Sequence, residues 1–131
     1  MTGNDGARLV LAPVSIGELI DKITILEIKS ERIGDAGKKA NVDRELAALV
    51  RLRDDLDLDA GVVPLATGLA QVNSRLWEIE DALRALEAAG RFDAEFVALA
   101  RSVYRENDRR AALKKQINLL ARSAIVEEKS H

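Results

Sequence analysis

Three polar residues fall where the longest predicted helix should be apolar. The apolar positions of this helix advance by four and three residues from Phe92 and resume at Leu113. The same spacing places Glu106 and Arg110 in the gap, with Asn107 beside them. A charged layer inside an apolar seam lowers stability unless its members are paired and hydrogen-bonded. The layer is therefore either a device for specific packing or a binding site.

This layer belongs to a larger polar cluster on the last two predicted helices. Short loops make consecutive helices antiparallel neighbours, so these two pair about their turn near Arg91. The pairing gathers ten candidate ligand-binding residues: Asn73, Trp77, Glu78, Asp81, Arg101, Tyr104, Arg105, Asn107, Asp108 and Arg110. Guanidinium forks suit carboxylate or phosphate, tyrosine and asparagine add neutral donors, and the indole offers a flat face to a ring. The cluster predicts recognition of an anionic small molecule.

A purely structural interpretation of the same residues stays open. Glu106 and Arg110 are a favourable pair at i, i+4, worth about 0.2–0.5 kcal/mol. Such ion pairs are common on the exposed faces of long helices. The two charges then either close on each other inside the bundle, or open with Arg101, Arg105 and Asn107 toward a ligand.

Acidic pairs raise the question of a metal site. Glu78 and Asp81 are i, i+3 neighbours on one predicted helix, and Glu27 and Glu31 are i, i+4 neighbours on another. All-helical nucleoside triphosphate pyrophosphatases hold magnesium with an ExxE on one helix and an ExxD on the next. Only the ExxD is present here, and nearby lysine or arginine side chains can neutralise the other pair. We expect no cofactor and no metal, with Glu78 and Asp81 as the only candidate ligands.

Polar residues also mark the start of the first predicted helix. Ser15 and Glu18 form a capping box, which accounts for them without a phosphate at the helix N-terminus. Asp21 and Thr24 lie on a flank beside branched apolar residues. That placement predicts a helix interface with hydrogen bonds across it.

Composition excludes several classes of function. The 131 residues suit one domain, 1–131, and the net charge of -2 gives no footprint for nucleic acid. Cysteine is absent and His131 is the only histidine, so one chain builds neither a thiolate nucleophile nor a multi-histidine metal site. The apolar run Leu9 to Val14 is far shorter than a membrane span of about 18 residues. We expect a cytoplasmic protein without membrane contact.

The apolar periodicity predicts an all-α fold. Its four helices cover about 16–33, 40–58, 64–89 and 94–122, with residues 1–8 flexible and 124–131 as a tail. They should form an elongated, coiled-coil-like antiparallel bundle of two helical hairpins. Short extended segments at the two ends, Leu9 to Val14 and Ile125 to Lys129, are expected to pair with each other. Because the first helix is apolar on more than one face, a homodimer is expected.

Capping residues, glycines and apolar positions define the helices further. Gly34 to Gly37 should end the first helix, Gly90 should be a left-handed stop, and Asp93 should cap the last helix. The second helix should turn four apolar residues inward: Val42, Leu46, Leu49 and Leu56.

Several stretches together resemble a known family. They are PVSIGELIDKITILEIK at 13–29, LWEIED at 76–81, LARSVY at 99–104, NDRRA at 107–111, IN at 117–118 and EEKS at 127–130. Over nearly its full length the chain is similar to a small bacterial all-helical family of uncharacterised proteins, domain of unknown function 6165. His131 stands where the family pattern has tyrosine. The resemblance implies that these polar segments are family features, and it implies a link to genes for cell-surface polysaccharide assembly.

The leading hypothesis is a non-enzymatic, dimeric helical module that binds a protein partner or an anionic small molecule. One alternative is a small helical enzyme acting on a phosphorylated or carboxylated metabolite, with Arg101, Arg105 and Arg110 as a clamp and Glu78 or Glu106 as acid or base. The other is a protein resembling the magnesium-dependent nucleotide pyrophosphatases. An enzyme should present a concave pocket lined by these arginines.

Overall fold

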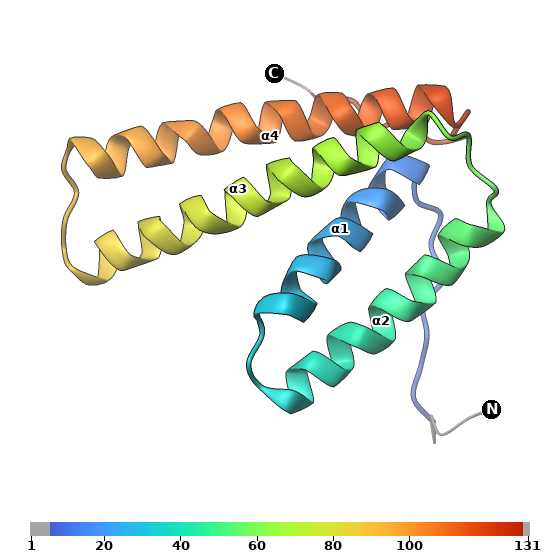
Figure 1. Cartoon of the computed structure of the whole chain (residues 1–131), viewed down its shortest axis with the longest axis horizontal. Coiled ribbons are helices and arrows are strands. Elements are labelled where there is room, and N and C mark those ends of the chain that lie inside the picture. Colours follow the sequence, from blue (N-terminus) through green and yellow to red (C-terminus); the bar gives the residue numbers. More distant parts are fainter. Residues whose placement is uncertain (1–5, 130–131) are drawn as a thin grey trace.

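The computed structural model describes residues 6–129, and within them the chain forms four helices and no strand (Figure 1). The helices are α1 (Ile16–Arg32), α2 (Ala36–Asp55), α3 (Val62–Ala88) and α4 (Ala94–Leu120). The predicted all-α fold is confirmed. None of the helices in this part of the chain is both long and apolar enough to cross a bilayer.

The two longest helices, α3 and α4, form a hairpin (Figure 1). Gly68 of α3 lies against Leu113 of α4, and seven residues further along α3 Arg75 meets Glu106, seven residues earlier on α4. The helices therefore run in opposite directions in register. Gly90, with φ of 67°, provides the left-handed stop expected at the turn.

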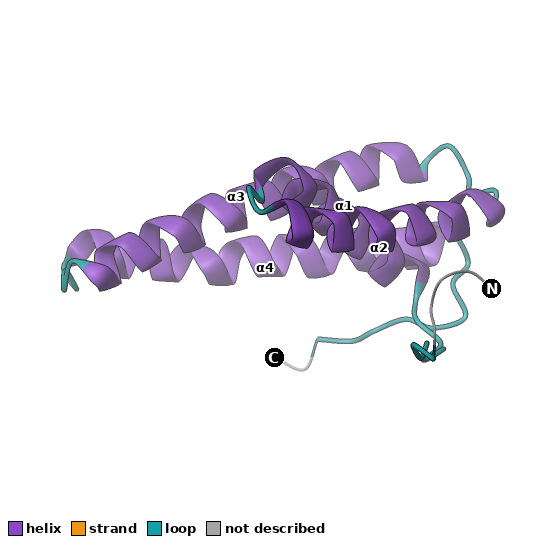
Figure 2. Ribbon diagram, turned by 90° about the horizontal axis from the view of Figure 1, so that it is seen from below, coloured by secondary structure: helices purple, strands orange, loops and turns teal. Residues whose placement is uncertain are grey.

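The second hairpin, α1 and α2, lies at an angle to the first, near one end of it (Figures 1 and 2). Helix α1 contacts all three other helices, which confirms that its several apolar faces are buried. Helix α2 contacts only α1 and buries no residue. Of the four apolar residues expected to turn inward, Val42, Leu46 and Leu49 are half-buried, whereas Leu56 lies just beyond the helix and is exposed. Because α1 is the only helix that packs against α2, the side chains of α2 are covered on one side only.

The core lies where α1 and α3 begin and α4 ends. One cluster there consists of Ile20 of α1, Val62 and Leu69 of α3, and Ile117 of α4, between 0% and 4% exposed. Three helices meet here, so polar groups on the same faces are also enclosed. The opposite end of the α3–α4 hairpin extends beyond α1 as two helices alone (Figure 1).

The predicted helix ends agree with the structure within about four residues. The largest difference is at α2, which starts at Ala36, because the Asp35 side chain accepts a hydrogen bond from the backbone N–H of Lys38 at 2.8 Å. Gly37 thus lies inside α2 and not in the linker. The caps predicted at Ser15 and Asp93 are both present.

The two non-helical ends do not pair as strands. No backbone hydrogen bond joins Leu9–Val14 to Ile125–Lys129 in the described residues, so that prediction is wrong. The C-terminal segment instead places the Glu127 carboxylate at the start of α1, where the Ser15 hydroxyl donates to it. Flexibility of residues 1–8 stays a prediction, and residues 1–5 of that range lie outside the described residues.

Candidate functional site

A buried polar network surrounds Asp21 of α1, which is 0% exposed. Arg110 of α4 donates from Nε and Nη2 to the two oxygens of Asp21, at 2.9 and 2.5 Å. Asn73 of α3 donates to the Asp21 carboxylate at 2.9 Å and to the Thr24 hydroxyl at 2.8 Å. The network joins three helices and confirms that Asp21 and Thr24 mark an interface with hydrogen bonds across it.

Arg110 is held rigidly but not fully enclosed. Hydrogen bonding to Asp21 raises the pKa of Arg110, against the opposing effect of burial, so its guanidinium stays charged. The side chain retains 30% of its exposure. No hydrogen bond within residues 6–129 uses its Nη1 atom. One edge of the guanidinium therefore binds Asp21, and the other makes no hydrogen bond within residues 6–129.

Glu106 and Arg110 do not close on each other. Glu106 is 7% exposed, as the apolar spacing predicts, and it accepts from Arg75 at 2.9 Å and from Arg109 at 2.7 Å. The alternative in which they pair at i, i+4 is not formed, because each charge has a partner elsewhere: Arg75 and Arg109 for Glu106, and the buried Asp21 for Arg110. Each half of the polar layer is therefore paired separately.

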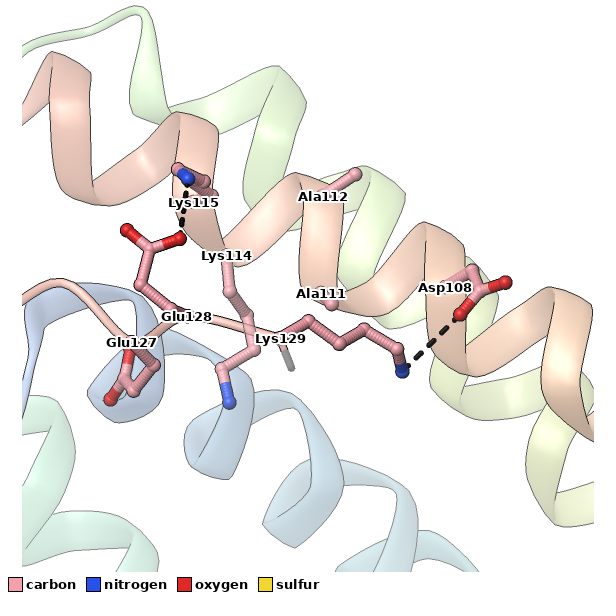
Figure 3. A pocket seen from close by; sticks show the side chains of 8 residues that line it. All are labelled: Asp108, Ala111, Ala112, Lys114, Lys115, Glu127, Glu128 and Lys129. Carbon is pink, nitrogen blue, oxygen red and sulfur yellow. Dashed lines mark hydrogen bonds and ion pairs between the residues drawn. The ribbon is translucent and has the colours of Figure 1, made fainter. Parts of the chain in front are cut away.

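A groove follows the exposed flank of α4 beside Arg110. It is lined by Tyr104, Asn107, Asp108, Arg110, Ala111, Lys114 and Lys129. The segment after α4 runs back along this helix, as Figure 3 shows for the adjoining hollow. Lys129 binds Asp108 at 3.2 Å and Lys115 binds Glu128 at 2.8 Å. The C-terminal segment thus forms one wall of the groove.

The groove combines three cations with neutral donors. Lys114 binds Glu18 at 2.7 Å, and Lys129 binds Asp108 in a pair whose side chains are 36% and 66% exposed. An exposed pair of this kind is worth about 0–1 kcal/mol, so an incoming anion can replace the carboxylate at little cost. Tyr104 is 72% exposed and keeps its hydroxyl accessible. The arrangement suits an oxyanion.

The structure gathers only part of the predicted cluster. Four predicted residues line the groove: Tyr104, Asn107, Asp108 and Arg110. Asn73 lies behind it, in the Asp21 network. Arg101 and Arg105 are exposed and do not line it, so the predicted three-arginine clamp is not assembled.

The other predicted residues lie away from the groove. The guanidinium of Arg32 stands 5.8 Å from the Trp77 ring and binds Glu78 at 2.6 Å. Glu78 and Asp81 are exposed, and within residues 6–129 no three acidic or histidine side chains converge as metal ligands would. Trp77 therefore faces an arginine of its own chain.

Contacts at the start of α1 involve residues that the sequence did not indicate. The Ser15 hydroxyl accepts from the N–H of Glu18 at 3.0 Å and donates to the carboxylate of Glu127 at 2.7 Å. Asn118 accepts from the N–H of Gly17 at 2.6 Å. Glu18 binds Lys114 and does not reach back to Ser15, so half of the predicted capping box is wrong. The backbone N–H groups that a phosphate would use at this helix start therefore already donate to the side chains of Ser123, Asn118 and Ser15.

Glu127 gives this contact a pH dependence. Burial has the largest single effect and raises its pKa, but hydrogen bonds from Ser15 and Asn118 and the charge of Lys114 outweigh burial and leave the pKa lowered. A carboxyl group whose pKa is lower in the folded protein than in the unfolded chain stabilises the fold at pH values above its unfolded-state pKa. This stabilisation is lost as the pH falls through its folded-state pKa.

We therefore expect the Glu127 carboxyl carbon to titrate by NMR with a midpoint below 4.5, the ordinary glutamate value. Ser15→Ala should raise that midpoint because it removes the hydroxyl donor. An unchanged midpoint in Ser15→Ala would contradict the role of this hydrogen bond.

Comparison with known proteins gives one match. Residues 11–131 match the model of a family described as a family of unknown function, DUF6165. No curated protein and no solved structure matches the chain. The matched range includes the Asp21 network, the groove and the contacts at the start of α1.

Proposed function

From the premise that the chain belongs to DUF6165, a family of unknown function, we propose that it is a helical module binding a small phosphorylated or carboxylated molecule in the groove beside Arg110. The observation that carries this proposal is the anchoring of Arg110 by the buried carboxylate of Asp21. A guanidinium fixed in this way loses little conformational entropy when its second edge binds an oxyanion. Binding then requires no rearrangement of the arginine.

The groove offers further recognition around that edge. Its volume of about 600 Å³ lies within the usual range for small-molecule sites. The Tyr104 hydroxyl and the Asn107 amide are neutral donors that fix orientation, and Lys129 adds charge once the anion replaces Asp108. Phosphate or carboxylate groups fit this donor set.

Binding is favoured over catalysis. The two carboxylates considered as acid or base, Glu78 and Glu106, do not line the groove, and both are held by arginines. The homodimer, the cytoplasmic location and the link to polysaccharide assembly stay predictions. A protein partner likewise stays a prediction.

We expect inorganic phosphate and glucose 1-phosphate, but not glucose, to bind the protein and raise its melting temperature. A ligand at about 100 times its Kd adds roughly 2.7 kcal/mol to the free energy of unfolding. In calorimetric titrations of the folded variants, Arg110→Lys and Tyr104→Phe should weaken binding, whereas Arg105→Lys should not. Equal binding to Arg110→Lys, or an equal response to glucose, would contradict the proposal.

A further inference from the structure

The segment before α1 exposes an uninterrupted apolar stretch. Leu9, Val10 and Leu11 are 84%, 86% and 86% exposed, and Val14 is 57% exposed. Arg8 precedes them. In an extended chain Leu9 and Leu11 share one face. A stretch of this kind is the usual mark of a contact surface.

A groove of matching character lies between the two hairpins. Its floor is apolar and includes Ile20 and Ile23 of α1 and Val62 and Ala66 of α3. Its lining carries four carboxylates, among them Asp54, against the single guanidinium of Arg53. The groove exists because α2 contacts α1 but not α3. A second hollow, between the same helices, extends it toward Ser74.

We propose that two copies of this chain exchange residues 8–14, and that each segment lies in the groove between α1, α2 and α3 of the other copy. The lengths agree: the groove follows α3 from Val62 to Ser74, about 18 Å at the helical rise, and residues 9–14 span about 20 Å when extended. The charges agree as well, because Arg8 meets an acidic rim. Reciprocal exchange builds a closed two-fold dimer.

The start of α1 directs the segment to a second copy. The N–H of Ile16 donates to the Ser123 hydroxyl at 3.1 Å, and Ser15 is bound to Glu127. These contacts fix the direction in which the chain leaves α1, and it leads away from the helices (Figure 2). The segment does not enter its own groove. This surface is separate from the groove on α4, so it stands whether or not an anion binds there.

The first test is the molar mass of the full chain by light scattering. The wild type should be a dimer, and Leu9→Asp/Leu11→Asp should raise the dimer dissociation constant at least about tenfold, because two leucines lose their burial. Phe92→Asp is the matched control, since Phe92 is 57% exposed in a distant turn. A monomeric wild type, or a dimer unaffected by the double substitution, overturns the proposal.

The second test identifies the occupant of the groove. The chain has no cysteine, so Leu11→Cys and Ala66→Cys introduce the only thiols. Mixing the two single variants under oxidising conditions should give a disulfide-linked dimer containing one of each. A Leu11→Cys/Ala66→Cys chain that links only within itself, or mixed chains that do not cross-link, would show that the segment is not exchanged.

Discussion

Replacing Arg110 by alanine is expected to lower the free energy of unfolding by about 3–5 kcal/mol, because it leaves the carboxylate of Asp21 buried without a counter-charge. Asp21 is 0% exposed and would retain only the amide of Asn73 as a side-chain donor. Denaturation in urea measures the change. Arg105→Ala is the matched control, because this arginine is exposed one turn away, and its effect should stay within about 0.5 kcal/mol.

A double variant separates the pair from its neighbours. Asp21→Leu/Arg110→Leu removes both charges and should recover much of the lost stability, because replacing a whole buried ion pair by apolar groups is often neutral. It also leaves Asn73 with the Thr24 hydroxyl as a partner. A loss in Arg110→Ala as small as that in Arg105→Ala would mean that the Asp21 network does not stabilise the fold.

Gly17→Ala is expected to lower the free energy of unfolding by about 1–3 kcal/mol or more. This range is the usual cost of inserting a methyl group into a packed contact. A Cβ at residue 17 would lie 2.6 Å from the backbone oxygen of Lys114 and 2.9 Å from the Asn118 side-chain oxygen. The backbone of α4 cannot move without disturbing the hydrogen bond from Gly17 to Asn118.

Gly34→Ala is the control for this substitution. A Cβ at Gly34 has no neighbour within 4 Å, so the change should be neutral or stabilise by about 0.4–1 kcal/mol through the unfolded state. Thermal unfolding of both variants measures the difference. Equal stabilities would contradict the close approach of α1 to α4.

The sequence predicts local structure well because caps and periodicity act within one helix. Ser15, Asp93 and Gly90 end or begin helices as their chemistry requires. The inward place of Glu106 follows from the same periodicity. The number of neighbours of a helix cannot be predicted from periodicity. The apolar stripe of α2 has the spacing of a buried helix, although only α1 packs against it.

The candidate site was predicted in part for the same reason. Tyr104, Asn107, Asp108 and Arg110 lie close together within α4, so helical spacing alone brings them to one site. The partner of Arg110 depends on how α1 crosses that hairpin, and Asp21 is 89 positions away in the chain. The final segment has no periodicity, which left its lysine and glutamate contacts without a sequence signal.

Anion binding by Arg110 is tested most directly by the NMR signal of its guanidinium during titration with glucose 1-phosphate. In the free protein its Nε–H should exchange slowly, because it is bound to buried Asp21. Added ligand should shift the Nη resonances of Arg110 while the Nε–H stays protected, because only the outer edge binds. Unchanged Arg110 resonances, with shifts confined to Arg101 and Arg105, would show that the anion does not bind in the groove beside Arg110.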